Sequence, residues 1–225
     1  MRIFLSVFIL IISFQSWTKA DDIRDFEIEG MSIGDNLLEH HTTIGITKKK
    51  LKNFKLAYYP NSKKFAGLNI SDAGNFKQYE NVQFHVDPNN YQIHAISGRI
   101  SSPFHNDLDK CIKKMEIVFN DLKSLFPNVE IFKGNKKAHA ADKTGNSLTK
   151  KYYFTLSNGR IRIDCTDWSK DYRDSNGRKV RDNFMISLVS KELTITVFIF
   201  SAVTVGTIIL GLSSLFLITL SFFKI

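Results

Sequence analysis

His85 and His94 are the two side chains in this sequence with the clearest capacity for chemistry. Two imidazoles can bind a metal ion or exchange protons near neutral pH. If their strands form a hairpin in which Val86 opposes Tyr91, both histidines lie on one sheet face, about 7 to 8 Å apart at Cα. No third ligand can be assigned from this register. We therefore expect no metal site and no cofactor, and an enzyme that uses His85 and His94 remains an alternative.

The two cysteines, Cys111 and Cys165, are predicted to face one core. Cys111 lies on the apolar face of a helical pattern, and Cys165 shares a strand face with Ile161 and Ile163. Two such cysteines in an exported protein favour a disulfide. A catalytic thiol is the alternative, but apolar burial raises the pKa of a thiol and makes it inert. The pattern predicts a Cys111–Cys165 disulfide and identifies no catalytic residue.

The stretch from Gly30 to Asp35 could be a phosphate-binding turn or the start of a helix. A P-loop needs a lysine directly after its last glycine, whereas here a carboxylate follows and would repel phosphate. Ser32 and Asp35, just before Leu37 and Leu38, match a capping box instead. The sequence therefore predicts a helix cap at Ser32 and Asp35, with His40 at the end of a short helix.

Periodicity predicts the elements that position these residues. Apolar residues recur at three- and four-residue steps from about Asn106 to Phe126, which indicates a long amphipathic helix with Asn106 as its N-cap. Runs of period two around 82–86, 91–96, 151–156 and 160–168 indicate strands, with a hairpin turn at Asn158-Gly159. The expected fold is α+β: an antiparallel sheet of about five to seven strands packed by one short and one long helix.

The two ends of the chain predict export and membrane attachment. A charge, a short apolar run and small residues up to Ala20 follow in signal-peptide order, so we expect residues 1–20 to be a cleaved signal peptide. Residues 194–223 are uncharged, and as a helix they would be about 45 Å long, enough to cross a bilayer. We expect residues 21–190 to form an exported domain, a transmembrane helix over 194–223, and a periplasm-facing position in a bacterial cell envelope.

The chain is basic, with a formal net charge of +9. Outside the cytoplasm, a basic surface favours an anionic lipid, a polysaccharide or an acidic protein as partner, although a merely solvated surface is the alternative. No aromatic residue interrupts the lysine runs, so nucleic acid is not an expected partner. The predicted basic surface comprises Lys48, Lys49, Lys50, Lys52, Lys133, Lys136 and Lys137.

The motif F-x-I-E-G-M-S-I-G-D at Phe26–Asp35, with the later segments YYPNSKKF, IHAISGRI and IRIDCTDWS, resembles an uncharacterised family of small exported proteins from marine alphaproteobacteria. The resemblance covers roughly residues 21 to 190. It implies export but no activity, cofactor or site residue. The apolar C-terminal run departs from that family.

These observations favour a noncatalytic, membrane-tethered interaction module of the envelope with a basic surface. The alternative is an envelope hydrolase or metal-dependent enzyme that uses His85 and His94. No convergent set of acid, base and nucleophile can be assigned from the sequence, which is why the interaction module is preferred. The oligomeric state is not determined by these patterns.

Overall fold

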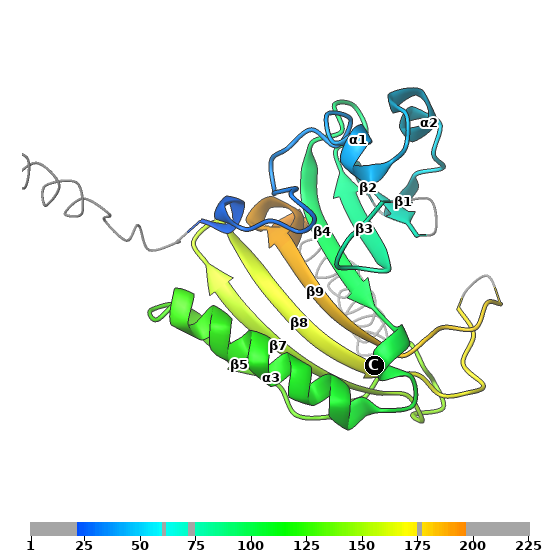
Figure 1. Ribbon diagram of the computed structural model, residues 1–225, viewed down its shortest axis with the longest axis vertical. Coiled ribbons are helices and arrows are strands. Elements are labelled where there is room, and N and C mark those ends of the chain that lie inside the picture. The colour runs from blue at the N-terminus through cyan, green and yellow to red at the C-terminus, as the bar shows by residue number, and fades with distance from the viewer. Residues whose placement is uncertain (1–21, 60–61, 72–74, 175–176, 197–225) are drawn as a thin grey trace, which may run out of the picture.

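A computed structural model describes residues 22–59, 62–71, 75–174 and 177–196 (Figure 1). The predicted signal peptide lies outside these ranges, as does most of the predicted membrane span. Residues 191–196 are helical and follow the last strand directly. Within the described ranges, no helix combines the length and the hydropathy that a membrane span requires.

The described residues form an α+β fold around one antiparallel sheet of nine strands, which confirms the predicted class. The sheet order is β1-β2-β3-β4-β9-β8-β7-β5, and β6 pairs with β7. The strands are β1 (Ala57–Tyr59), β2 (Ser62–Ile70), β3 (Asn81–Val86), β4 (Ile93–Ile100), β5 (Glu130–Lys133), β6 (Lys137–Ala138), β7 (Leu148–Leu156), β8 (Gly159–Asp167) and β9 (Asn183–Ser190).

The sheet is larger than the five to seven strands predicted, because three strands have weak sequence signals. In β2, the small residues Ala66 and Gly67 interrupt the alternation of large apolar and polar side chains. β5 has four residues and β6 has two, and both pair with β7 near its outer side. Short edge strands carry too few residues to show a period.

One long helix, α3 (Leu108–Leu125), packs on β8 and β9 (Figure 1). Its buried residues are Cys111, Met115, Phe119 and Leu122, which repeat at the predicted three- and four-residue steps. The N-cap lies one residue later than predicted: it is Asp107, and its carboxylate accepts a hydrogen bond from the Lys110 amide at 2.9 Å. Asn106 precedes this cap and has a φ of 54°, in the left-handed region, whereas an N-cap residue typically has an extended backbone.

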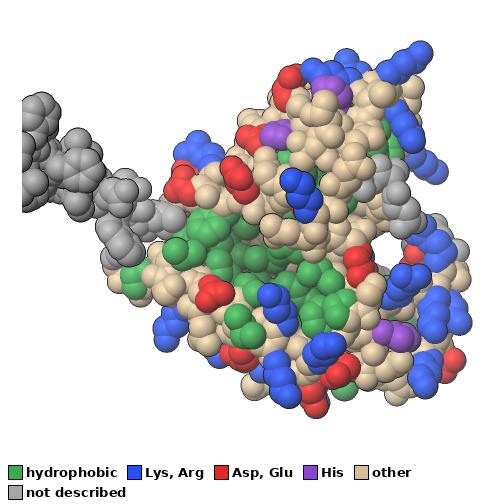
Figure 2. Space-filling view, in the orientation of Figure 1, with side chains coloured by type: hydrophobic (Ala, Val, Ile, Leu, Met, Phe, Trp, Pro, Cys, Tyr) green, Lys and Arg blue, Asp and Glu red, His purple; other side chains and the backbone are tan. Residues whose placement is uncertain are grey.

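The remaining helices are short. α1 (His41–Ile44) and α2 (Lys48–Lys52) precede β1, and two 3-10 turns, η1 (Ile23–Asp25) and η2 (Ser102–Phe104), precede α1 and α3. Together with α3, these segments cover the apolar face of the sheet, where one large cluster of buried side chains forms the core. Figure 2 shows that apolar side chains remain visible between α3 and the α1–α2 region on this side of the molecule.

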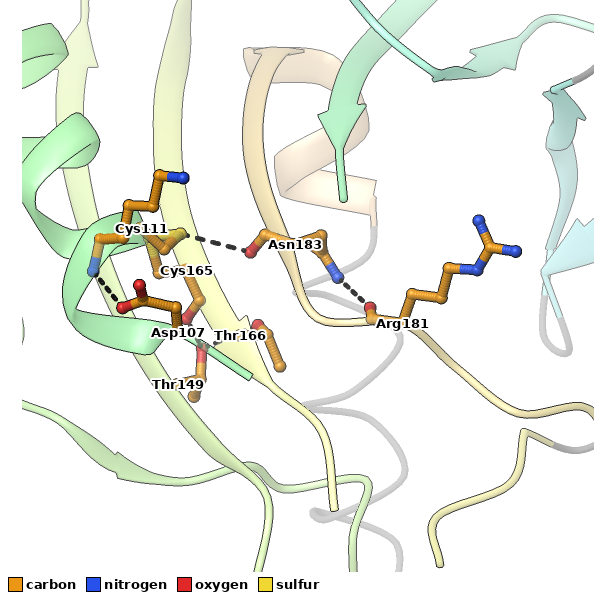
Figure 3. The surroundings of a disulfide bond; sticks show 8 residues. Asp107, Cys111, Thr149, Cys165, Thr166, Arg181 and Asn183 are labelled. Carbon is orange, nitrogen blue, oxygen red and sulfur yellow. Dashed lines mark hydrogen bonds between the residues drawn. A yellow bond between two sulfur atoms is a disulfide. The ribbon is translucent and has the colours of Figure 1, made fainter. Parts of the chain in front are cut away.

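The predicted disulfide is present between Cys111 and Cys165 and joins α3 to β8 (Figure 3). The two Cα atoms are 5.8 Å apart, and both residues are at most 2% exposed. The carbonyl of Asn183 lies 3.6 Å from the Cys111 sulfur. Because both sulfurs are bonded and buried, neither is available as a nucleophile.

Ser32 and Asp35 do not cap a helix, which corrects the prediction. The Asp35 carboxylate accepts a hydrogen bond from the Ser32 amide at 2.9 Å, but the residues that follow form turns, and α1 begins only at His41. The cause is pairing with the start of β4. The Gly34 amide donates to the Ile93 carbonyl, and the Ile93 amide donates to the Asp35 carbonyl, both at 2.8 Å. Extended pairing of this kind is incompatible with a helix beginning there.

The hairpin between β7 and β8 is present as predicted, although its two turn residues are Ser157 and Asn158. Gly159 begins β8, opposite Leu156. The Asn158 side chain accepts a hydrogen bond from the Ile23 amide at 3.0 Å and so attaches the N-terminal segment to the hairpin. This close approach leaves no space for a side chain at position 159.

We predict that Gly159→Ala lowers the free energy of unfolding by about 2 kcal/mol. A Cβ atom at this position would lie 2.7 Å from the Val189 carbonyl oxygen and 2.9 Å from Ile23 Cγ2, so backbone would have to move. Urea unfolding of the full chain measures the effect. Thr155→Ser, at an exposed position of the same hairpin, is the control and should change stability by less than about 0.5 kcal/mol. Equal stability of the two variants would contradict the prediction.

Candidate functional site

The sheet face opposite α3 carries most of the polar side chains of the central strands. In β8, Ile161 and Ile163 belong to the core. Successive side chains of a strand point to opposite faces, so Arg160, Arg162 and Asp164 project from the other face. This charged face was missed in the sequence, because alternation of apolar and charged residues is equally typical of a strand with one side in solvent.

Small side chains line the middle of this polar face. Ser97 of β4 pairs with Ser187 of β9, which pairs with Arg162 of β8; on the other side, Ser97 pairs with Gln83 of β3. In the neighbouring row, Ala95 pairs with His85 and with Val189. Small residues in the centre and larger ones at the ends leave a hollow on the sheet.

This hollow is a cavity of about 370 Å³, which we call the sheet-face pocket. Two arginines and several hydrogen-bonding groups line it together with apolar side chains, and none of the lining residues that the structure describes is acidic. Its lining is Tyr59, Gln83, His85, Ala95, Ser97, Arg160, Arg162, Ser187, Val189, Leu193 and Thr194.

Asp164 fixes the position of Arg162, which lines the pocket. The Arg162 Nε atom lies 2.9 Å from Asp164 Oδ2, and the two side chains are 31% and 3% exposed. Burial raises the pKa of Asp164, and the nearby positive charges of Arg162, Lys151 and Arg99 oppose that rise. Arg162 Nη2 also donates to Ser187 Oγ at 3.5 Å. The guanidinium is therefore positioned before any ligand binds.

Arg160 has unused hydrogen-bonding capacity. Its guanidinium carbon lies 4.8 Å from the centre of the Tyr153 ring, which positions the group by a cation–π contact. Within the described part of the chain, the Arg160 side chain makes no hydrogen bond or ion pair, and its Nε atom is buried without a partner. Buried polar groups are usually hydrogen-bonded, so unpaired N–H groups beside a cavity are suited to a ligand.

His85 is neutral at physiological pH. Its Nδ1 atom shares a hydrogen bond of 2.8 Å with the Tyr59 hydroxyl. Burial, with a smaller contribution from the charge of Arg162, lowers the pKa of His85 to about 4, and burial raises the pKa of Tyr59. In the described residues neither Ser97 nor Ser187 is hydrogen-bonded to His85. The site therefore has a half-buried imidazole, and no described serine is activated by it.

His94 does not pair with His85 in the predicted way. Val86 pairs with Ile93 rather than Tyr91, and a bulge follows, so His85 opposes Ala95. The His94 Nδ1 atom lies 3.4 Å from Ser190 Oγ and 3.4 Å from a Glu192 carboxylate oxygen, contacts separate from those of His85.

The bulge follows from the loop before β4. The Tyr91 amide donates to the Asp87 carbonyl at 2.8 Å, and Tyr91 itself has a φ of 60°, so it cannot continue the strand pairing. Across the described ranges, no group of three or more His, Cys, Asp or Glu side chains could hold a metal ion.

The lysines predicted to form one basic surface lie in two separate places. Those of α2 precede β1, at one edge of the sheet, and those of β5 and β6 lie at the other edge. Figure 2 shows blue side chains at both ends of the molecule. Lys48 pairs with Glu39 at 3.0 Å, and Lys133 pairs with Glu116 at 3.0 Å and lies over the Phe119 ring. The two groups are therefore independent surface features.

No family model, curated protein sequence or solved structure matches this chain.

Proposed function

We propose that this chain is a noncatalytic, membrane-tethered binding module of the cell envelope that holds an anionic group in the sheet-face pocket. The observation that carries the proposal is that Arg160 and Arg162 both line a cavity in which no described lining residue is acidic. A guanidinium presents its N–H donors in a planar fork that matches a carboxylate or phosphate. Asp164 neutralises at most one of the two charges.

Hydrogen-bond donors around the arginines support binding of an anion. The Ser97 and Ser187 hydroxyls and the Gln83 amide are available to an anion's remaining oxygens. The geometry around His85 supports binding over catalysis, because among the described residues its imidazole is hydrogen-bonded to the Tyr59 hydroxyl and not to a serine hydroxyl of the pocket. An enzyme that uses His85 and His94 stays the alternative; a hydrolytic activity abolished by His85→Gln would favour it.

Export and attachment are part of the proposal. Disulfides persist in oxidising compartments, so the buried Cys111–Cys165 bond supports a location outside the cytoplasm. We propose that residues 1–20 direct export and that residues 194–223 hold the domain at the membrane, with the domain facing the periplasm. The two lysine groups would offer separate contacts to a polysaccharide or an acidic protein.

We expect inorganic phosphate to stabilise the full chain in non-ionic detergent relative to sodium chloride at matched ionic strength. At about ten times Kd, a ligand of the folded state adds about 1.4 kcal/mol, which raises the unfolding midpoint by about 4 °C for a chain of this size. Arg160→Gln should remove most of this shift, because it deletes the unpaired guanidinium. Thermal unfolding measured by circular dichroism gives both midpoints.

Lys49→Gln is the matched control, because it removes one positive charge from an exposed position on α2. It should leave the phosphate shift unchanged. A shift that survives in Arg160→Gln, or one that disappears equally in both variants, would show that phosphate acts through the general positive charge and would refute the proposed site.

A further inference from the structure

One wall of the sheet-face pocket is made by the first turn of the C-terminal segment. Leu193 and Thr194 line the pocket. Leu193 is 3% exposed and packs against Phe65 and Ala95, two side chains on the polar face of the sheet. The Thr194 hydroxyl donates to the Ser190 carbonyl at 3.0 Å. These residues belong to the folded domain and the pocket at once.

Polar contacts fix the position of this turn on the sheet. A carboxylate oxygen of Glu192 lies 2.8 Å from Lys64 Nζ of β2, and the other lies 3.4 Å from Nδ1 of His94, in β4. The Leu193 amide donates to Ser190 Oγ at 3.2 Å. The last described turn of the chain is therefore held at a defined point beside the pocket.

This turn also marks the change from charged to uncharged residues in the sequence. Lys191 and Glu192 are the last charged residues before an uncharged run that begins at Leu193 and extends to Phe223. If this run enters a bilayer, the change from charged to apolar residues falls at the headgroup layer, which is roughly 5 to 8 Å thick on each side. A pocket lined by Thr194 then lies at the depth of the lipid headgroups.

We propose that the sheet-face pocket binds the phosphate of an anionic phospholipid in the membrane that holds residues 194–223. This inference rests on the proposed anion-binding function and names its ligand. Arg160 and Arg162 would hold the phosphate oxygens through charge-assisted hydrogen bonds. The apolar lining residues Ala95, Val189 and Leu193 would contact the glycerol and the first acyl carbons. Inorganic phosphate carries the same anionic group but gains no such apolar contact.

Isothermal titration of the full chain in non-ionic detergent tests the inference. The probes are dihexanoyl phosphatidylglycerol, dihexanoyl phosphatidylcholine and inorganic phosphate. We expect phosphatidylglycerol to bind at least about tenfold more tightly than either other probe, since each 1.4 kcal/mol of additional contact corresponds to a tenfold change. Arg160→Gln should weaken phosphatidylglycerol about tenfold, and Lys49→Gln should leave it unchanged.

Val189→Thr separates the lipid from free phosphate, because it keeps the side-chain shape and makes one wall of the pocket polar. It should weaken phosphatidylglycerol several-fold and leave inorganic phosphate unchanged. Equal, Arg160-dependent affinity for phosphatidylglycerol and inorganic phosphate would overturn the lipid assignment and leave the anion site standing. If no probe shows binding that depends on Arg160, both the anion site and the lipid assignment are overturned. Equal weakening by Arg160→Gln and Lys49→Gln would also overturn both, in favour of a diffuse basic surface.

Discussion

Reduction of the Cys111–Cys165 disulfide should lower the free energy of unfolding by about 4 kcal/mol. The bond joins residues separated by 54 positions, and on the chain-entropy model the closure of such a loop restricts the unfolded state by about that amount. It also connects α3 to β8, the central contact between the helix and the sheet. For a chain of this size, the expected fall in unfolding midpoint is on the order of 10 °C.

Thermal unfolding with and without a thiol reductant measures this effect. The double variant Cys111→Ala with Cys165→Ala is the control, because it should unfold near the midpoint of the reduced protein and show no response to reductant. If the natural chain unfolds at the same temperature in both conditions, or if two free thiols titrate before reduction, the bond does not contribute as the structure indicates.

Stability should also fall as the pH is lowered from about 6.5 to about 4. The folded-state pKa of His85 is about 4, whereas an unperturbed histidine has a pKa of about 6.5. Between these values the unfolded state binds more protons than the folded state, so stability rises with pH. The contribution of His85 is fully present above pH 6.5 and is lost as the pH falls through this window, by roughly 3 kcal/mol at most.

Urea unfolding at pH 7.5 and pH 4.5 measures this loss in the natural chain and in His85→Gln. Glutamine can keep a hydrogen bond to Tyr59 but does not titrate, so the variant should lose much less stability between the two pH values. Burial also lowers the pKa of His94 and His139, so some pH dependence remains in the variant. His105→Gln, whose side chain is 58% exposed, is the control and should keep most of the slope. Identical slopes in the natural chain and His85→Gln would contradict the assignment.

Local periodicity was sufficient to predict the elements whose formation depends on burial of one face. The three- and four-residue repeat around Cys111 and Met115 defines α3, and the alternation at Ile161, Ile163 and Cys165 defines β8. Each pattern permits one face to point into the core, and the two cysteines lie on those faces. The disulfide could therefore be predicted, because it follows from two local patterns and from the packing of helix on sheet.

The candidate site was decided by the tertiary structure, because it depends on register and on strand order. A bulge changed the partner of His85 and separated it from His94, and pairing with β4 kept Asp35 out of a helix. The pocket needs the small residues of β4 and β9 to align between larger ones on β3 and β8, and β4 and β9 are far apart in the sequence. Sequence alone determined which side chains point away from the core; only the order of the strands brought Arg160 and Arg162 beside Leu193, since neighbours across a sheet are set by long-range pairing.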